Sequence, residues 1–396
     1  MSRRVFVTGV GIVSAIGNGT GETLSSLKNL TSGIGKLSLF ESIHGHIPVA
    51  EVKLNHKQLA KLAEIDNDQS PYSRNSLLAL IAAKEALASA SWDRNRDLTS
   101  GAVMATTVGG MDMNEQYYRS LLQDDSHKDI ILLLDSADCT GKVAFMAGIR
   151  QHISTISTAC SSSANSIMLG ARLIKNNRLH RALVGGTDAL TRFTLNGFSA
   201  LEILSITGCR PFDKNRNGLT IGEGAAVLIL ESEEVADPAR IICEITGYAN
   251  ANEAFHATAS SADGLGAHLA MSGALETASL KPEDISYINA HGTGTEINDL
   301  SEGRAIQKIF GSLIPPVSST KAFTGHTLGA AGAVEAVFSI LALQNQFLLP
   351  GLNFSTPMEE LNFQPVTNPS PAELKHVMSN SFGFGGNNTS LIFSKV

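Results

Sequence analysis

The chain has 396 residues, of which 43% are hydrophobic and only 17% are charged. At about 150 residues per domain this length fits two or three domains. The charge fraction is below the roughly 25% of an average globular domain, which indicates a large body with extensive internal or subunit contacts. Thirty basic and thirty-seven acidic residues give a net charge of −7, which argues against a nucleic-acid-binding protein. No run of about 18 consecutive apolar residues occurs, so we expect no membrane span.

Four cysteines, without a CxxC pair or regular spacing, predict neither a disulfide framework nor a zinc site. Near the N-terminus two arginines precede an apolar stretch, as in a signal peptide, but Thr8, Gly9, Gly11 and Ser14 interrupt it. We interpret the stretch as a strand followed by a turn, and we expect a cytoplasmic protein. Its glycines follow G-x-G-x-x-S, which departs from the dinucleotide-binding fingerprint, so we expect no nucleotide site.

Short segments rich in β-branched residues alternate with longer helical ones, which predicts a layered α/β fold. In the first half of the chain we expect strands at Val5–Val10, Gly101–Val108, Ile153–Thr158, Ala182–Gly185 and Ala225–Glu231, and helices at Ser76–Ser89 and Ser161–Lys175. In the second half we expect strands at Ile241–Thr246, Ser286–Ala290 and Val317–Thr320, and helices at Gly266–Ser279 and Gly332–Gln344.

The second half repeats features of the first at a nearly constant distance. ISTA at 156–159 matches SSTK at 318–321, 162 positions later, and a helix follows each. GEGAAVLIL at 222–230 matches GGNNTSLIF at 385–393, 163 positions later. Similarity at one offset is typical of a duplicated unit. We therefore predict two similar halves, residues 1–238 and 239–396, whose loops meet at one site.

Cys160 lies in TACSSS, where the strand Ile153–Thr158 meets the helix Ser161–Lys175. A helix N-terminus presents unpaired N–H groups and about half a positive charge, which can lower a thiol pKa from about 8.5 to roughly 3.5–7.5. We therefore expect a nucleophilic thiolate, with a small buried hydrophobe as the alternative. The alternative is our expectation for the other cysteines, which are Cys139, Cys209 and Cys243.

Two histidines are candidates for the same site. His291 in NAHGTGT ends a predicted strand, and His326 in KAFTGHTLGAAGAVE precedes a helix. Two imidazoles at strand ends can donate N–H bonds to one oxygen, which would stabilise an enolate. Lys321 and Glu335 flank His326, where a buried pair would fix the loop and set its field; a surface lysine and a helix glutamate are the alternative.

The C-terminal NSFGFGGNN surrounds two phenylalanines with glycines, so its backbone either approaches something closely or moves. Phe384, between two glycines, could then act as a gate, with a tight turn before the last strand as the alternative.

In this order, TACSSS, HGTGT, KAFTGHTLGAAGAVE and SFGFGG resemble the motifs of a β-ketoacyl–acyl carrier protein synthase of the elongating type I/II class. The opening VFVTGVGIVSAIG and the segment Arg210–Ala226 are also similar, so the resemblance covers essentially the whole chain. It implies the thiolase fold, in which duplicated βαβαβαββ halves form a layered α-β-α-β-α body. That fold agrees with the internal repeat.

The resemblance also implies a role for each candidate residue. Cys160 resembles the nucleophile that accepts the acyl group as a thioester, and His291 and His326 resemble the pair that assists malonyl decarboxylation and stabilises the enolate. Lys321 resembles the lysine beside the second histidine, with Glu335 as its partner. The N–H groups of Cys160 and Phe384 would form the oxyanion hole, and Phe384 would also be the gate. The resemblance implies that Thr293 and Thr295 bind the pantetheine arm and that Phe198 and Leu219 contact the substrate.

The expected reaction is a decarboxylative Claisen condensation that extends an acyl chain with malonyl–acyl carrier protein. The resemblance implies no metal and no redox cofactor, because the substrates are carried on the phosphopantetheine of an acyl carrier protein. It implies a dimer, either of identical chains or with a related synthase.

Three alternatives differ from this hypothesis at specific residues. A thiolase needs a second catalytic cysteine near its C-terminus, and none follows Cys243. The initiating type III synthases use a Cys-His-Asn set, and Asn289 is not placed to replace His326. A non-catalytic chain-length-factor-like subunit usually lacks the nucleophile, which is present here as Cys160.

The sequence departs from the elongating enzymes where the acidic carrier protein docks. Those enzymes carry a basic cluster before the helix Ser76–Ser89, whereas DNDQSPYSRN has Arg74 as its only base. The segment FSALEILSITGCRPFD lacks the arginines or lysines that the family often shows there, and R-N-G-L at 216–219 replaces the usual R-D-G-F. We therefore expect a dedicated carrier and a specialised substrate, as in aryl-polyene or flexirubin-like pigment synthesis.

Overall fold

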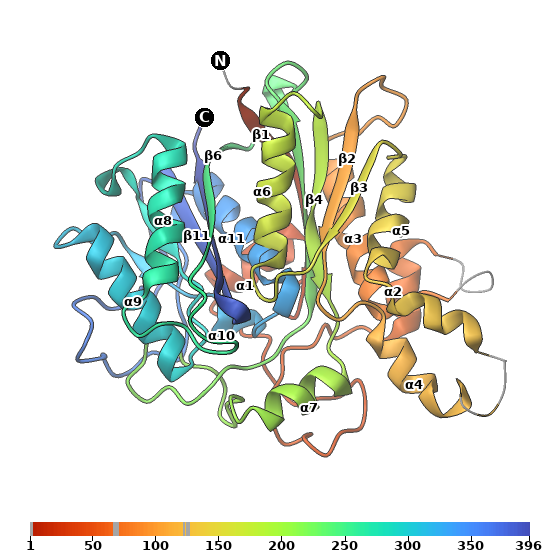
Figure 1. Cartoon of the computed structure of the whole chain (residues 1–396), viewed down its shortest axis with the longest axis horizontal. Coiled ribbons are helices and arrows are strands. Elements are labelled where there is room, and N and C mark those ends of the chain that lie inside the picture. The colour runs from red at the N-terminus through yellow and green to blue at the C-terminus, as the bar shows by residue number, and fades with distance from the viewer. Residues whose placement is uncertain (1–2, 66–70, 122, 124–126) are drawn as a thin grey trace.

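The strands of the two halves are hydrogen-bonded in a single series. The computed structural model describes residues 3–65, 71–121, 123 and 127–396 (Figure 1). Its ten-stranded mixed sheet has the order β3-β2-β4-β5-β1-β6-β12-β11-β7-β8. The strands are β1 (Val5–Ser14), β2 (Ser100–Ala105), β3 (His152–Ile156), β4 (Arg181–Asp188), β5 (Gly224–Ser232), β6 (Cys243–Asn252), β7 (Tyr287–Asn289), β8 (Val317–Ser318), β11 (His376–Gly383) and β12 (Asn387–Ser394). A separate small pair joins β9 (Phe347–Leu348) to β10 (Ser370–Pro371).

The strand order repeats within this series. From β1 outward the first half runs β5, β4, β2, β3, and from β6 outward the second half runs β12, β11, β7, β8. The two runs meet where β1 pairs with β6, through Phe6 with Glu244 and Val7 with Cys243. The strands β5 and β12, which contain the matched sequences GEGAAVLIL and GGNNTSLIF, occupy equivalent places. The internal repeat found in the sequence is therefore a repeat of topology.

Helices form three layers around the strands. The central layer is α6 (Ser162–Lys175) and α11 (Ala331–Asn345), which contact each other and strands of both halves. Figure 1 shows α3 (Arg74–Ser89) and α5 (Ala137–Ala147) on one outer side, and α8 (Leu265–Ala278) and α9 (Glu296–Phe310) on the other. The remaining helices are α1 (Thr20–Lys28), α2 (His56–Ala63), α4 (Met111–Leu121), α7 (Arg192–Ala200) and α10 (Lys321–Thr324). This arrangement is the α-β-α-β-α body that the resemblance implied.

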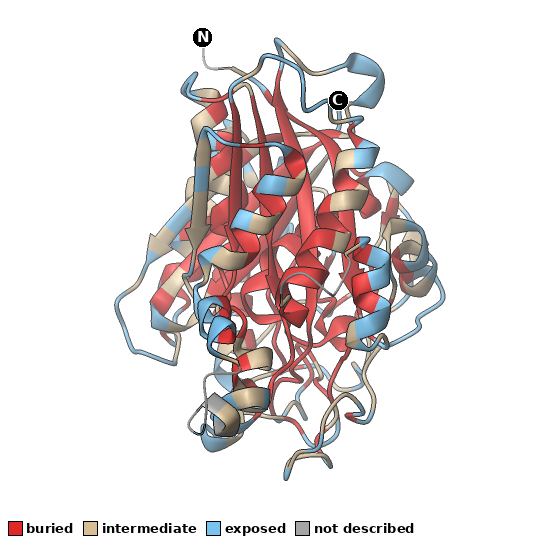
Figure 2. Cartoon of the chain, turned by 90° about the vertical axis from the view of Figure 1, so that its right-hand side faces the viewer, coloured by how far each residue is buried: buried red, intermediate tan, exposed pale blue. Residues whose placement is uncertain are grey.

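The central helix α11 is apolar on all sides because it is enclosed on all sides. Its residues Ala331–Leu343 are all buried, whereas the outer helices show exposed faces (Figure 2). The segment Leu328–Asn345 is long and apolar enough to cross a membrane, but 89% of it is buried inside the molecule. It is therefore a core helix, as expected for a helix without a polar stripe.

Strand β1 extends to Ser14, past the predicted end at Val10, and its glycines allow close packing. A Cβ atom on Gly11 would lie 2.1 Å from the carbonyl oxygen of Ala82, and one on Gly9 would lie 2.3 Å from that of Ala86, both on α3. These glycines therefore allow the helix to rest on the strand, and they form no phosphate-binding loop.

The predicted strand Gly101–Val108 ends earlier, at Ala105. The next residues turn toward the buried carboxylate of Asp188, which accepts hydrogen bonds from the N–H groups of Thr107 (2.9 Å) and Val108 (3.1 Å). The same carboxylate accepts from the N–H of Gly329 (2.6 Å), in the loop after His326. Asp188 thus ties loops of the two halves together beside the cavity described next.

Candidate active site

Cys160 lies on a sharp turn between β3 and α6. Ala159, directly before it, has a left-handed backbone with φ of 52°, a conformation that costs a non-glycine residue about 1–2 kcal/mol. The hydroxyl of Ser162 stabilises the turn by accepting from the N–H of Thr158 (2.8 Å) and donating to the carbonyl of Ala159 (2.5 Å). Cys160 is itself buried and lines a cavity.

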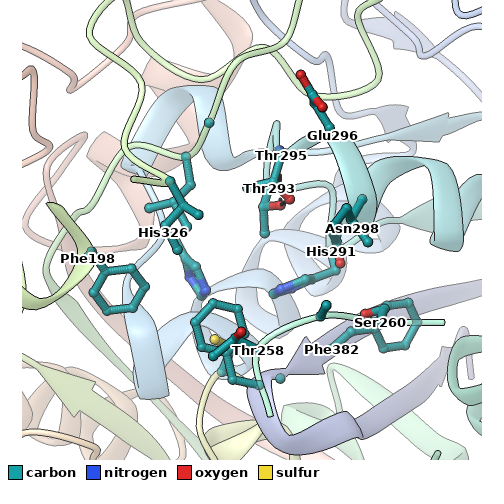
Figure 3. Close-up of a pocket in the computed structure, with 18 of the residues that line it drawn as sticks. Phe198, Thr258, Ser260, His291, Thr293, Thr295, Glu296, Asn298, His326 and Phe382 are labelled. Atoms are coloured by element: carbon teal, nitrogen blue, oxygen red, sulfur yellow. Dashed lines mark hydrogen bonds between the residues drawn. The ribbon is translucent and has the colours of Figure 1, made fainter. Parts of the chain in front are cut away.

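The two histidines come from loops of the second half and face the same point. His291 follows β7 and His326 follows α10, and Figure 3 shows their rings directed toward one another. The ring centroids are 5.3 Å apart, with the planes at 85°. One nitrogen of each ring and the sulfur of Cys160 all lie within 4.8 Å of one another. The structure thus brings together three residues that are 131 and 35 positions apart in the chain.

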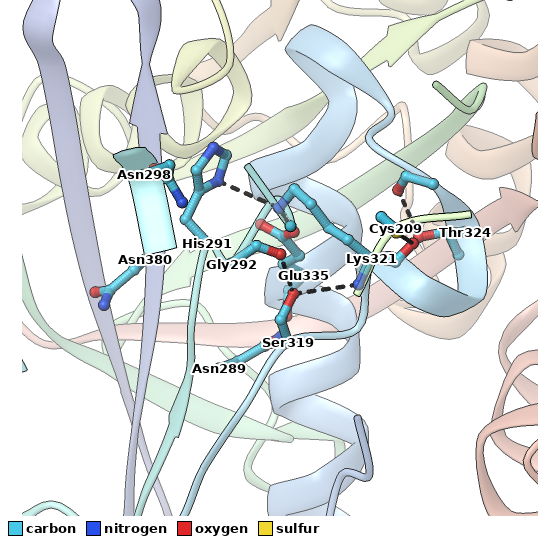
Figure 4. A network of polar contacts seen from close by, with 12 residues as sticks. Cys209, Asn289, His291, Gly292, Asn298, Ser319, Lys321, Thr324, Glu335 and Asn380 are labelled. Carbon is cyan, nitrogen blue, oxygen red and sulfur yellow. Dashed lines mark hydrogen bonds and ion pairs between the residues drawn. The ribbon is translucent and has the colours of Figure 1, made fainter. Parts of the chain in front are cut away.

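Lys321 and Glu335 form a buried ion pair behind His291 (Figure 4). The ammonium Nζ of Lys321 also lies 3.2 Å from Nδ1 of His291. An ammonium group can only donate, so Nδ1 must accept and the ring proton of neutral His291 must lie on Nε2. Lys321 therefore fixes His291 as an N–H donor toward the cavity. The surface lysine that the sequence left open is not what the structure shows.

His326 is held by its backbone and leaves its ring free. Its N–H donates to the carbonyl of Thr220 (2.6 Å), and its carbonyl accepts from the N–H of Gly222 (3.0 Å). Neither ring nitrogen has a hydrogen-bond partner among the described residues. The ring of His326 can therefore either accept or donate a proton, unlike that of His291.

Burial and Lys321 together keep both imidazoles neutral. The pKa of His291 lies well below its usual value because of desolvation, with further lowering by the Lys321 charge and by His326. Desolvation and Lys321 likewise lower the pKa of His326. Burial raises the pKa of Glu335 to about 7, against the opposing effect of Lys321.

The expectation that the helix N-terminus lowers the pKa of Cys160 is wrong. Burial raises the pKa of this thiol to about 11, although Lys321 and a hydrogen bond from the N–H of Phe384 act to lower it. Helix α6 begins only at Ser162, two residues beyond the cysteine, so its end does not outweigh desolvation. The thiol is therefore protonated at neutral pH and needs a proton acceptor. Burial also raises the pKa values of the other three cysteines, as expected for inert thiols.

A channel of about 360 Å³ leads to Cys160, His291 and His326. Its walls include the expected substrate-binding residues, which are Phe198, Leu219, Thr293 and Thr295. The hydroxyls of Thr293 and Thr295 lie 2.9 Å apart and are hydrogen-bonded to each other.

A second cavity of about 390 Å³ reaches Cys160 from the side of α7 and is lined mainly by apolar side chains, among them Val108, Phe193, Leu201 and Leu328. Phe198 and Phe384 line both cavities, and their rings stack with centroids 6.1 Å apart. Phe384 therefore stands between the channel, whose walls are both polar and apolar, and the more apolar pocket. A Cβ atom on the preceding Gly383 would lie 3.1 Å from the backbone nitrogen of Cys160 and 3.1 Å from the carbonyl oxygen of Thr158, so a larger residue there would press on the cysteine turn.

Two acidic residues of α9 support the site and were missed in the sequence. The carboxylate of Glu302 accepts from the N–H groups of His291 (2.9 Å) and Gly292 (2.8 Å), and burial raises its pKa to about 7. Asp299 accepts from the N–H groups of Gly294 (3.1 Å) and Phe212 (2.7 Å). The sequence signal that could have indicated them is their position in the first turns of a helix that starts directly after HGTGT.

Two groups of atoms near the site are of types that can act as metal ligands. Cys160, His291 and His326 are zinc-type ligands, but the ammonium of Lys321, 3.2 Å from His291, opposes a cation there. Behind them, Asn289 Oδ1, Glu335 Oε2 and Ser379 Oγ are buried oxygen atoms without a hydrogen-bond partner. Oxygen ligands of this kind suit a hard cation such as Mg²⁺ or Ca²⁺.

Models of two protein domains match most of the chain. Residues 2–236 match the β-ketoacyl synthase N-terminal domain, and residues 242–355 match the β-ketoacyl synthase C-terminal domain. The chain belongs to the β-ketoacyl synthase family. The resemblance drawn from the motifs is thereby confirmed, and with it the assignment as a condensing enzyme of fatty acid or polyketide synthesis.

Curated relatives span the whole chain. The 3-oxoacyl-[acyl-carrier-protein] synthase 2 of Staphylococcus aureus strain COL is 33% identical over 416 residues, covering 100% of this chain and 99% of the relative. Nodulation protein E of Rhizobium meliloti is 34% identical over 417 residues, covering 100% of both.

Solved structures confirm the fold. The ishigamide ketosynthase/chain length factor has a TM-score of 0.92 at 29% identity, with 100% of both chains covered. The ketosynthase ApeO, solved in complex with its chain length factor ApeC from Xenorhabdus doucetiae, has a TM-score of 0.84 at 33% identity, with 100% of this chain and 98% of that chain covered.

Proposed function

We propose that this synthase condenses an acyl group held on Cys160 with a malonyl group delivered by an acyl carrier protein, and that His291 and His326 have different tasks. The observation that carries the proposal is the meeting of one thiol and two neutral imidazoles within 4.8 Å at the end of a channel. Lys321 makes one imidazole a fixed donor and leaves the other free to exchange its proton.

In the first step the sulfur of Cys160 attacks the thioester carbonyl of the acyl carrier. The thiol proton passes to the free ring of His326 and then to the departing pantetheine sulfur. The new C–S bond forms first and gives a tetrahedral intermediate, and the carrier's C–S bond breaks when that intermediate collapses. The oxyanion of the tetrahedral intermediate accepts hydrogen bonds from the backbone N–H groups of Cys160 and Phe384. The acyl chain then occupies the apolar cavity beyond Phe384.

In the second step a malonyl carrier enters through the channel along Thr293 and Thr295. The bond to its carboxylate breaks, carbon dioxide leaves, and the electron pair moves onto the thioester oxygen as an enolate. That oxygen accepts N–H bonds from Nε2 of His291 and from the ring of His326. Preorganised donors of this kind contribute about 2.7–4 kcal/mol each.

In the last step the enolate carbon attacks the thioester on Cys160. The oxyanion of this second tetrahedral intermediate again accepts hydrogen bonds from the N–H groups of Cys160 and Phe384. When the intermediate collapses, the C–S bond to Cys160 breaks. The product is a 3-oxoacyl carrier, and the Cys160 thiolate takes up one proton from water, which balances the loss of carbon dioxide from the malonyl carboxylate. Loss of carbon dioxide makes the sequence effectively irreversible.

We infer further that the chain acts with a second subunit. Strand β3 is the terminal strand of the sheet and carries the half-exposed Ile153, and Phe145 of α5, a helix that contacts β3, is also exposed. A free edge with apolar side chains is a surface that proteins cover. ApeO, which is similar to this chain, was solved with a chain length factor. We propose a homodimer or a heterodimer with a related subunit. We also propose that the two halves of the chain divide between residues 238 and 239, and that the protein is cytoplasmic.

The variants Cys160→Ala and Cys160→Gln test the central assignment. Cys160→Ala should abolish 3-oxoacyl carrier formation, because no thioester can form. Cys160→Gln should retain release of labelled carbon dioxide from malonyl carrier, because both imidazoles remain. Condensation that survives in Cys160→Ala would show that the nucleophile is another residue.

A further inference from the structure

The buried carboxylate of Asp188, at the end of β4, is bonded to two segments that line the apolar cavity beyond Phe384. Its Oδ1 accepts from the N–H groups of Thr107 (2.9 Å) and Val108 (3.1 Å), which both line the cavity. Its Oδ2 accepts from the N–H of Gly329 (2.6 Å), directly after Leu328, which lines the same cavity. One carboxylate therefore fixes a segment of each half of the chain relative to the other.

The hydroxyl groups beside Asp188 complete its hydrogen bonds. Thr107 Oγ1 donates to Oδ2 (2.5 Å), and Thr106 Oγ1 donates to Oδ1 (2.6 Å). Thr106 Oγ1 also accepts from Asn75 Nδ2 (3.1 Å) and from the N–H of Gly109 (3.1 Å), so its own proton must face Asp188. Both oxygens of Asp188 are thus used as acceptors.

The backbone of Leu328 is constrained at this contact. Leu328 has a left-handed φ of 53°, a conformation that bulky residues rarely adopt and that persists only where the surroundings fix it. No space separates the two segments, because a Cβ atom on Gly329 would lie 2.7 Å from Asp188 Oδ2 and 2.9 Å from Thr107 Cγ2. If the bond from Gly329 to Asp188 is lost, the two segments can move apart and the cavity widens.

The reacting groups are held independently of Asp188. The backbone of His326 is bonded to Thr220 and Gly222. None of the hydrogen bonds of Asp188 among the described residues reaches Cys160, His291 or His326. A change at Asp188 therefore acts on the shape of the cavity before it acts on the chemistry.

We propose that Asp188 is a positioning residue that sets the width of the apolar cavity and thereby favours straight acyl chains over wider ones at Cys160. The proposal rests on the proposed function, since it assumes that the acyl chain on Cys160 occupies this cavity. The carboxylate acts only through the 107–108 and 328–329 segments.

The experiment compares protein-free thioesters of N-acetylcysteamine. The octanoyl and cyclohexylacetyl thioesters have acyl groups with the same number of carbon atoms but different widths. The acetyl thioester has no chain to reach the cavity, so it reports the chemistry at Cys160 alone. Acylation of Cys160 by each thioester is followed by intact mass.

Asp188→Asn keeps the shape of the side chain but cannot keep all of its bonds. Its NH₂ group must face a backbone N–H in either orientation, and facing Gly329 gives up fewer bonds than facing Thr107 and Val108. The ratio of cyclohexylacetyl to octanoyl acylation should then rise at least about 10-fold, because a misfit of one methylene group in an apolar pocket changes selectivity by roughly 10- to 200-fold. The acetyl rate should stay near that of the wild type.

Gly329→Ala tests the same contact by a different route. Its added methyl group would press on Asp188 and Thr107 and part the two segments, so the ratio should rise in this variant too. Gly21→Ala, whose methyl group meets no atom within 4 Å, is the matched control and should keep the wild-type ratio.

Asp213→Asn is the matched control for a buried carboxylate. Asp213 accepts from the N–H groups of Asn215 (2.7 Å) and Thr356 (2.8 Å) and lines neither cavity. This variant should lower the thermal unfolding temperature and leave the ratio unchanged, which separates a change of cavity shape from a loss of stability.

The proposal is overturned if the ratio stays at the wild-type value in Asp188→Asn and Gly329→Ala, or if acetyl acylation falls as far as octanoyl acylation. If one of these variants does not fold, the other decides. Loss of folding in both would also overturn the proposal, because Asp188 would then serve the fold as a whole. Failure of the proposed function gives a different pattern, in which no thioester acylates Cys160 of the wild type.

Discussion

Replacing His291 with alanine should slow decarboxylation while leaving acyl transfer to Cys160 nearly unchanged. Nδ1 of His291 lies 3.2 Å from the ammonium of Lys321, so the ring offers only an N–H bond to the cavity. Removing one preorganised donor costs about 2.7–4 kcal/mol, which is roughly a 100- to 1,000-fold loss in rate. That loss falls on the enolate-forming step alone.

Replacing His326 with alanine should slow both steps. Its ring nitrogens are free, and it is the proton acceptor for a thiol whose pKa is about 11. At pH 7 only about one such thiol in 10,000 is ionised, so acyl transfer without the acceptor should fall by roughly 100- to 10,000-fold. Decarboxylation should fall as in His291→Ala, because one donor is again lost.

The assay measures the two steps separately on each variant. Rapid-quench intact mass gives the rate of Cys160 acylation, and labelled carbon dioxide from malonyl carrier gives decarboxylation. Thermal unfolding of each variant controls for loss of structure. The reasoning is refuted if His291→Ala slows acylation as much as decarboxylation, or if His326→Ala leaves acylation intact.

Three further predictions concern charge and packing. Since burial raises the pKa of Cys160 to about 11, alkylation by iodoacetamide should rise about tenfold per pH unit from 7 to 10, and a plateau near pH 7 would contradict this. Lys321→Met leaves Glu335 buried without its cation and should cost about 3–5 kcal/mol in urea unfolding at pH 8. A raised carboxyl pKa favours the folded state at low pH, so the cost of Lys321→Met should shrink toward pH 6. Adding Glu335→Gln should remove this pH dependence. A pH-independent cost in Lys321→Met alone would be inconsistent with a buried pair of Lys321 and Glu335. Gly11→Ala places a Cβ atom 2.1 Å from the Ala82 oxygen and should lower the free energy of unfolding by about 1–3 kcal/mol, whereas Gly21→Ala, with no neighbour within 4 Å, should not.

Much of the site could be predicted because its residues lie in local motifs. Cys160, His291 and His326 each follow a strand or turn that the sequence marks with small residues and glycines, and these places meet because the topology is duplicated. The residues of the sequence left Lys321 and Glu335 open between a buried pair and a surface lysine with a helix glutamate, and only the family resemblance implied the pair that the structure shows. The sequence did not show that the ammonium of Lys321 contacts His291, which is 30 positions away, instead of the nearby His326.

The missed features depend on long-range burial. Glu302 acts on His291 from one helix later, and its buried carboxylate looks in the sequence like any helix glutamate. Arg74 looked like a surface base, but its partner Glu223 lies 149 positions away. The thiol pKa was misjudged because a helix N-terminus is visible in a sequence, whereas the desolvation that outweighs it at Cys160 is not.

The most direct test is intact mass spectrometry of the purified protein with saturated, polyunsaturated and aryl acyl carriers, followed by malonyl carrier. The account predicts a mass gain on Cys160 with at least one carrier, and its loss on malonyl addition as a 3-oxoacyl carrier appears. A protein that no carrier and no protein-free thioester acylates at Cys160 would contradict the account and would instead indicate a non-catalytic partner subunit.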